Sequence, residues 1–430
     1  MAFINEWVNQ YKGYHRNVKL AQLANILAQI GMGVFLVIYN FYVRELGYSE
    51  QTNGEIIAFT SLATAIVLIP AGIMSDRTSR KKVMIFGSIL VALTLLFRGV
   101  FQDESLLLLF AFLTGAFMAF VQVSIVPWLA ENSTAKQRVH LFSFHFAVMT
   151  GANVIGNLIG GGLTDLLSLF TTELLAIRWT LIFGSAIFMA GIIPLFFLKE
   201  APKEKKSPSV KKRLPALHTW KEKKNSLILI GLFAFAQLLI GFGAGLVIPY
   251  LNLYFADRFE ASTSMVGLII SGGQAATAVA MFIGPLVVKR VGEVRAVVFL
   301  QLASLPFLLL TAYTQQLWLA ALGFLFRQAL MNAGNPIQTS LIMSRVDNEM
   351  KGLANSVNQM VFQLGWAVMG PVSTGIVIHY GAYWGYATVF TITAGLYLIG
   401  SVYFFIMFRS KFFEKLTVSQ TKVEASKTAG

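Results

Sequence analysis

The chain alternates between long apolar runs and short polar segments from residue 19 to residue 408. Each run has close to the roughly 20 residues that an α-helix needs to cross the hydrocarbon core of a bilayer. We therefore predict an all-α membrane protein with twelve transmembrane helices. The predicted spans are residues 19–43, 53–74, 83–101, 105–130, 141–164, 176–198, 226–255, 263–288, 296–314, 317–343, 353–378 and 383–408.

A basic segment that contains prolines divides these spans into two groups of six. Residues 19–198 are predicted to form an N-terminal six-helix bundle, and residues 226–408 a C-terminal one. Residues 199–225 are predicted to be a solvated linker and a candidate contact for anionic lipid, because Lys and Arg dominate its charge. Residues 1–18 are expected at the membrane interface, and residues 409–430 as a disordered tail.

Composition narrows the class further, because 56% of the residues are hydrophobic and only 13% are charged. The net charge of +14 is concentrated in alternate loops, which predicts orientation in a membrane with both termini cytoplasmic, and no nucleic-acid partner. We expect a multi-pass protein of a bacterial plasma membrane. Without cysteines, a phosphate-binding loop or a metal-ligand pattern, the sequence predicts no enzyme, no cofactor and no metal site.

A charged segment joins the second and third predicted spans, with the sequence Gly72-Ile-Met-Ser-Asp76-Arg77-Thr-Ser-Arg80-Lys81-Lys82. Orientation requires only positive charge, so it explains neither Asp76 nor Gly72. The segment resembles the signature loop between the second and third helices of the major facilitator superfamily, a large class of secondary transporters. It departs at Ser79, where the family usually has glycine. The resemblance extends over residues 19–408 and implies two six-helix bundles around a central site.

The resemblance also implies that this loop belongs to a cytoplasmic gate between the bundles, which opens when its polar contacts break. The alternative is a positively charged flank without a gating role. The implied gate residues are Gly72, Asp76, Arg77, Arg80 and Lys81, with Glu131 and Arg138 from the loop after the fourth span.

Glycines cluster in the fifth span around Gly156, Asn157, Gly160 and Gly161, and small residues let helices pack closely in lipid. The stretch resembles the exporter motif of the same superfamily, which has proline where Asn157 stands. The eleventh span carries a parallel pair, Gly370 and Pro371. These positions are predicted to be a helix-packing motif, and a connection with export stays open beside a packing role alone.

Three spans carry polar side chains that should face protein or a water-filled cavity. We predict a substrate pathway between these spans; hydrogen bonds between helices without ligand contact are the alternative. The predicted pathway residues are Gln22, Asn25 and Gln29 in the first span, Arg327, Asn332 and Asn335 in the tenth, and Asn358, Gln359 and Trp366 in the eleventh. Further polar side chains on the same helices are Asn40, Gln328, Gln338, Asn355 and Gln363.

Arg327 lies near the middle of its span, where an unpaired charge is costly. None of the twelve spans carries a carboxylate at that depth, so Arg327 is either a structural residue or a contact for an anionic or carbonyl-rich ligand. The lack of a deep acid also leaves coupling to protons undecided.

The residues and the resemblance together predict a secondary transporter of a small organic molecule that functions as a monomer by alternating access. Export, of the multidrug or metabolite type, is preferred because of the glycines in the fifth span and the aromatic-rich helices. Uptake or facilitated diffusion of a polar solute is an alternative. A receptor or scaffold that does not transport, or a lipid flippase on the same fold, are further alternatives.

Overall fold

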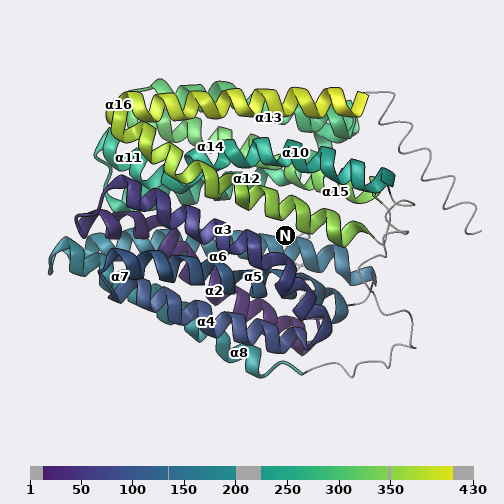
Figure 1. Ribbon diagram of the computed structural model, residues 1–430, viewed down its shortest axis with the longest axis horizontal. Coiled ribbons are helices and arrows are strands. Elements are labelled where there is room, and N and C mark those ends of the chain that lie inside the picture. Colours follow the sequence, from purple (N-terminus) through teal and green to yellow (C-terminus); the bar gives the residue numbers. More distant parts are fainter. Residues whose placement is uncertain (1–12, 134, 200–223, 347–349, 410–430) are drawn as a thin grey trace, which may run out of the picture.

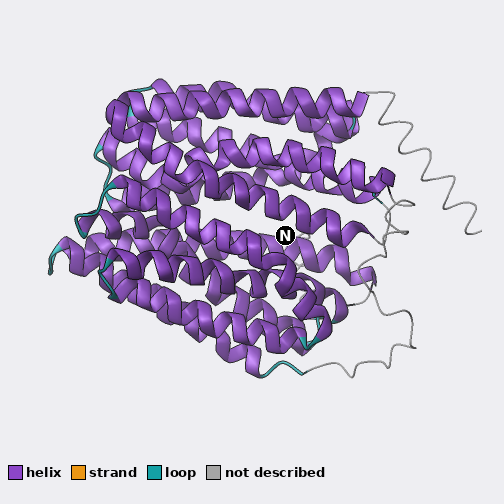
Figure 2. Cartoon of the chain, viewed as in Figure 1, coloured by secondary structure: helices purple, strands orange, loops and turns teal. Residues whose placement is uncertain are grey.

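The computed structural model describes residues 13–133, 135–199, 224–346 and 350–409 (Figure 1). All regular structure within these ranges is helical, without a strand (Figure 2). The predicted interfacial segment before Gly13, most of the linker and the predicted tail lie outside the described residues. The prediction of an all-α protein is confirmed for the part of the chain that the structure describes.

The first half of the chain comprises α2 (Arg16–Glu45), α3 (Glu50–Arg77), α4 (Arg80–Val100), α5 (Glu104–Glu131), α6 (Ala135–Ser168), α7 (Glu173–Ala190) and α8 (Ile192–Phe196). The second half comprises α10 (Lys224–Val247), η1 (Ile248–Tyr250), α11 (Leu251–Phe259), α12 (Thr263–Val291), α13 (Glu293–Tyr313), α14 (Leu317–Ala333), α15 (Asn335–Arg345) and α16 (Lys351–Arg409).

Ten helical segments among the described residues are long and apolar enough to cross a membrane. The last of them, within α16, contains two predicted spans, which join at Gly381 with a φ of 74° that glycine adopts without strain. The tenth span is the pair α14 and α15, interrupted at Gly334, just before Pro336 in the first turn of α15. The predicted arrangement of twelve membrane-crossing helices is therefore confirmed.

The two halves lie one above the other in Figure 1 and pack along two pairs of helices, α3 with α16 and α6 with α12. We call the end of the bundle at which Lys199 and Lys224 flank the linker the linker end. The opposite end, which carries Glu50, Asp103 and Asp257, is the distal end. The predicted cytoplasmic position of the linker end stays a prediction.

The buried hydrophobic core differs between these two ends. One large cluster reaches the distal end and contains residues of both halves, such as Ile38 of α2 and Tyr254 of α11. Toward the linker end each half has a cluster of its own, one including Met84 and the other including Phe233. Burial of apolar surface therefore joins the halves at the distal end and stabilises each half separately at the linker end.

Candidate functional site

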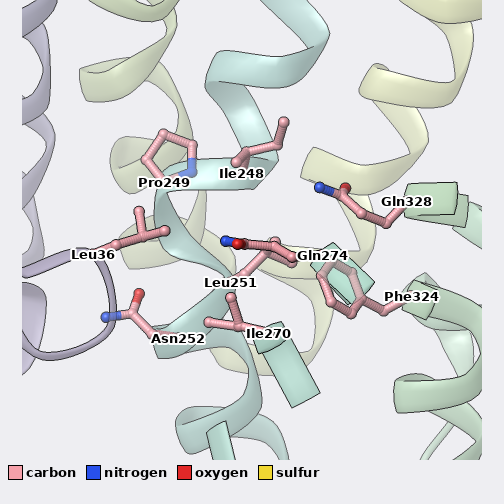
Figure 3. Close-up of a pocket in the computed structure, with 9 residues that line it drawn as sticks. All are labelled: Leu36, Ile248, Pro249, Leu251, Asn252, Ile270, Gln274, Phe324 and Gln328. Carbon is pink, nitrogen blue, oxygen red and sulfur yellow. The ribbon is translucent and has the colours of Figure 1, made fainter. Parts of the chain in front are cut away.

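A small cavity of about 40 Å³ lies between the halves (Figure 3). The first half lines this cavity with Leu36 of α2. The lining combines six apolar side chains with three amides and contains no charged side chain. Such a lining suits a small molecule with an apolar body and few polar groups. The residues from the second half are Ile248, Pro249, Leu251, Asn252, Ile270, Gln274, Phe324 and Gln328.

Asn252 has both ends of its amide occupied by the first half. The Asn40 side chain donates to Asn252 Oδ1 at 3.0 Å and to the Pro249 carbonyl at 2.7 Å, and Asn252 Nδ2 donates to the Val37 carbonyl at 2.9 Å. Asn40 and Asn252 are both buried, so these bonds form with little competition from water. The pair joins α2 to the α10–α11 region beside the cavity.

Gln274 begins a chain of amides that crosses between the halves. Its Nε2 donates to Asn153 Oδ1 at 3.4 Å, and Asn153 Nδ2 donates to Gln29 Oε1 at 3.0 Å. Gln29 is among the predicted pathway residues, whereas Asn153 and Gln274 are not. Both were identifiable only as isolated amides in apolar helices, and their proximity depends on how α6 packs on α12.

Arg327 is only 2% exposed and does not line the cavity, although its neighbour Gln328 does. Its Nη1 donates to Gln328 Oε1 at 2.7 Å, and its Nη2 donates to the Tyr397 hydroxyl at 2.8 Å. Nε has no partner within the described structure. No carboxylate pairs with this guanidinium among the described residues, and uncharged polar groups are the partners of two of its three nitrogens.

The other predicted pathway residues lie away from the cavity lining. Gln22 is buried against His145 of α6, with 3.2 Å between Gln22 Oε1 and His145 Nδ1. Asn335 donates to Asn332 at 3.2 Å, near the break between α14 and α15. The remaining side chains, of which only Gln359 is exposed, are Asn25, Asn358, Gln359 and Trp366.

The glycines of α6 face two different helices. A Cβ at Gly156 or Gly160 would meet the backbone of α2, whereas a Cβ at Gly161 would meet the backbone of Thr263, which begins α12 in the other half. Asn157 is fully buried, and both polar atoms of its side chain lack partners within the described structure. One face of α6 thus packs within the first half while the other contacts the second half.

The parallel pair in α16 also lies at the contact between the halves. A Cβ at Gly54 of α3 would lie 3.0 Å from Cα of Pro371 and 3.1 Å from the Gly370 carbonyl. The Thr374 hydroxyl, one turn further along α16, lies 3.5 Å from Gln51 Oε1. Close approach of the α3 and α16 backbones therefore requires a residue without a side chain at position 54.

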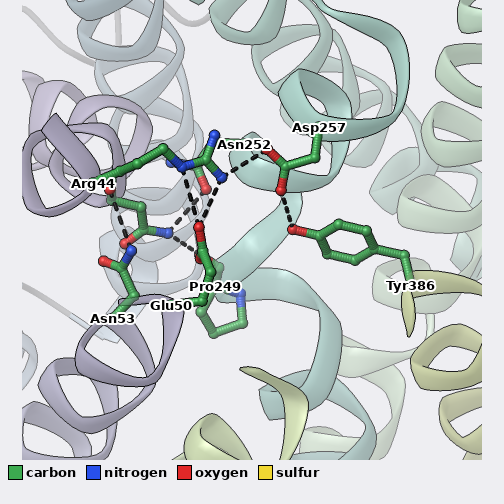
Figure 4. Close-up of polar contacts among 8 residues, drawn as sticks. Arg44, Glu50, Asn53, Pro249, Asn252, Asp257 and Tyr386 are labelled. Atoms are coloured by element: carbon green, nitrogen blue, oxygen red, sulfur yellow. Dashed lines mark hydrogen bonds and ion pairs between the residues drawn. The ribbon is translucent and has the colours of Figure 1, made fainter. Parts of the chain in front are cut away.

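Charged side chains join the halves at the distal end (Figure 4). Arg44 of α2 contacts Asp257 of α11 at 2.7 Å, and the same guanidinium contacts Glu50 at 2.9 Å. The Tyr386 hydroxyl donates to the other oxygen of Asp257 at 2.9 Å. In the sequence, Arg44, Glu50 and Asp257 look like ordinary charges in the loops between spans. The only sequence signal for this ion pair was that the short loops at the distal end carry opposite charges.

Asp165 makes a second polar contact at this end. Asp165 lies near the distal end of α6, in the first half. Its carboxylate accepts hydrogen bonds from two groups of the second half, the hydroxyl of Thr263 and the backbone N–H of Ser264, the latter at 2.9 Å. These groups form the first turn of α12, where unpaired N–H groups favour a negative charge. A carboxylate of one half therefore caps a helix of the other.

The predicted gate residues lie at the linker end. Arg80 pairs with Glu131 at 3.0 Å, which joins α4 to α5 within the first half. The ammonium group of Lys81 donates to backbone carbonyls of Phe196 at 3.0 Å and Leu198 at 2.7 Å, also within that half.

A Cβ at Gly72 would meet nothing within 4 Å, so this glycine makes no close helix contact in this conformation. The side chains of Asp76, Arg77 and Arg138 lie outside the described residues. The described contacts at this end thus stabilise one half and do not join it to the other.

The sequence and the structure of this chain were also compared with those of known proteins. The family model described as Major Facilitator Superfamily matches residues 22–237 and 233–429. Multidrug resistance protein MdtG of Proteus mirabilis is 27% identical over 92% of this chain and 97% of its own length. Quinolone resistance protein NorA of Staphylococcus aureus is 22% identical over 80% of this chain and 86% of its own. The crystal structure of the nucleoside transporter NupG has a TM-score of 0.73 at 18% identity, and the match covers 92% of this chain and all of that structure.

Proposed function

We propose that this chain, which belongs to the major facilitator superfamily of membrane transporters, exports small amphipathic organic molecules from a bacterial cell. The observation that carries this proposal is its similarity, along nearly the whole chain, to a protein named for multidrug resistance. The cavity supports it, because six apolar side chains and three amides form an uncharged lining between the halves.

The proposed mechanism is alternating access, in which the halves rock around the cavity. In the present conformation the halves are joined at the distal end by Arg44 with Asp257 and by Asp165 with the start of α12. We propose that export breaks these contacts while the predicted gate around Gly72 and Asp76 closes the linker end. In that state the empty space beside Gly72 would be filled by the second half.

Facilitated diffusion or uptake of a polar solute is the second candidate. The amides of Gln274 and Gln328 at the cavity favour it, since a more polar molecule could bond to both of them. The two functions differ in the direction in which a probe moves and in the chemistry of that probe.

The experiment is to express the protein in a bacterium that lacks its own drug exporters and to measure accumulation of nalidixic acid, a quinolone, and of uridine. Export predicts lower accumulation of the quinolone than in cells with the Gly161→Val variant, and unchanged uridine. Faster uridine entry with unchanged quinolone accumulation would reject export in favour of the second candidate.

A further inference from the structure

We infer that the cavity selects molecules that accept a hydrogen bond, because Arg327 orients Gln328 so that its amide NH₂ group faces the ligand. The inference rests on the proposed function, since it treats the cavity as the site of the transported molecule. It makes Gln328 a specificity-determining residue and Arg327 a positioning residue that does not itself touch the ligand.

The orientation of Gln328 follows from the chemistry of its partner. An arginine side chain has only donors, so the atom of Gln328 that lies 2.7 Å from Arg327 Nη1 must be the amide oxygen. The amide nitrogen then has no partner among the described residues and reaches toward the space beside Ile248 (Figure 3). The cavity thus gains two N–H donors from this residue.

The fork of Arg327 is itself held in place. Its second nitrogen donates to Tyr397 at 2.8 Å, and Arg327 as a whole is 2% exposed. Turning the Gln328 amide over would place its NH₂ group against a buried cation and break a charge-assisted hydrogen bond. Such a bond contributes enough that the reversed amide should be populated about tenfold less, or lower still.

The amide on the neighbouring helix lacks this constraint. Gln274 donates to Asn153 at the long distance of 3.4 Å, and Asn153 donates in turn to Gln29, so the chain consists of three uncharged amides that can all turn over together. Gln274 can therefore offer the cavity either a donor or an acceptor, whereas Gln328 can offer only a donor. A ligand with a carbonyl or carboxylate oxygen satisfies Gln328. The cavity of about 40 Å³ is too small for a ring in this conformation, so the ring would pack against Ile248 and Phe324 only after the halves move apart.

Two probes separate this selection from general binding. Nalidixic acid carries a keto oxygen and a carboxylate, whereas ethidium is an aromatic cation whose amino groups only donate. We would measure binding of both to purified protein, and their export from cells, for the wild type, Gln328→Met, Gln328→Glu, Arg327→Lys and the double variant Arg327→Lys with Gln328→Met. Gln274→Met serves as the matched control in the same cavity.

Gln328→Met keeps the length of the side chain and should weaken nalidixic acid binding about tenfold while changing ethidium binding less than twofold. Gln328→Glu keeps the partner of Arg327 but presents an acceptor, so it should lower the nalidixic acid to ethidium ratio further. Gln274→Met should leave that ratio near the wild-type value.

Arg327→Lys should lower the same ratio, and the double variant should lose no more than Gln328→Met alone, because Arg327 acts through Gln328. Additive losses, or an unchanged ratio in Gln328→Met, would overturn the inference. If Arg327→Lys fails to fold, the ratio in Gln328→Met decides by itself. If the wild type exports the probes but Gln328→Met has the wild-type ratio of nalidixic acid to ethidium, only the inference is refuted. A wild type that exports neither probe refutes the proposed function, and the inference falls with it.

Discussion

The distal and linker ends of this molecule hold its two halves in different ways. At the distal end a shared hydrophobic cluster, an ion pair between Arg44 and Asp257, and a carboxylate cap by Asp165 all cross from one half to the other. At the linker end each half has its own cluster, and the ion pair between Arg80 and Glu131 stays within one half. The difference teaches that the described contacts between the halves are concentrated at the distal end, so a movement that separates the halves there must break those contacts, while the clusters at the linker end stay within each half.

Among the substitutions considered, a larger residue at Gly161 should weaken the contact between the halves at the distal end most. The Cβ of Gly161→Val would collide with the backbone of Thr263, which cannot move away without moving α12. We expect the distal contact to weaken by about 1–3 kcal/mol, as overpacking usually does, and export to fall strongly. Gly162→Val is the matched control, because a Cβ there meets nothing within 4 Å.

Labelling of a single introduced cysteine measures how often the distal end opens, because the chain has no cysteine of its own. In the Thr374→Cys background the only thiol lies buried between α3 and α16. Gly161→Val should speed its reaction with a maleimide that does not cross membranes, and Gly162→Val should not. Equal rates in the two variants would contradict a distal end closed by this contact.

Removing the charge of the cross-half cap should have a smaller effect. Asp165→Asn can still accept from Ser264 but loses its charge beside the start of α12, which we expect to cost about 1 kcal/mol of distal closure. Labelling of Thr374→Cys should then rise roughly fivefold.

The control is Asp103→Asn, because Asp103 caps its own helix by accepting from Leu106 N–H at 3.1 Å. This variant should lower thermal stability without changing the labelling rate. If both variants change labelling equally, capping across the halves is not what closes the distal end.

Asp257→Asn should also weaken closure of the distal end, but less than Asp165→Asn does. Asp257 and Arg44 are 18% and 33% exposed, so solvent screens their ion pair, and about 0.5–1 kcal/mol of closure is at stake. A two- to fivefold rise in labelling is expected, and it should shrink at high salt. Glu260→Gln, an exposed distal acid, should change nothing; an equal response from it would point to net charge instead of this pair.

Glu131→Gln should produce the smallest change. It removes the partner of Arg80 inside one half, and Glu131 is 54% exposed, so we expect less than about 0.5 kcal/mol of stability to be lost. Distal labelling should match the wild type. Faster labelling than in Asp257→Asn would show that this pair also couples the two halves.

Hydropathy and turn residues were enough to predict the twelve helices, because a bilayer demands apolar runs of fixed length. The charged segment from Gly72 to Lys82 was enough to indicate the superfamily. The site was predicted less completely: Gln29 and Arg327 were selected as pathway residues, while Asn153, which donates to Gln29, and Tyr397, which accepts from Arg327, were not.

Sequence by itself determined the helical membrane class, the spans and the presence of buried polar groups, since these depend on local composition and on the bilayer. Tertiary structure alone decided that Gln328 lines a cavity while Arg327 lies behind it, and that Asp165 caps a helix almost a hundred residues later in the chain. The physical reason is that a hydrogen bond needs a partner within about 3.5 Å. Which partner lies there depends on the rotation and packing of helices from both halves, which periodicity along a single helix does not specify.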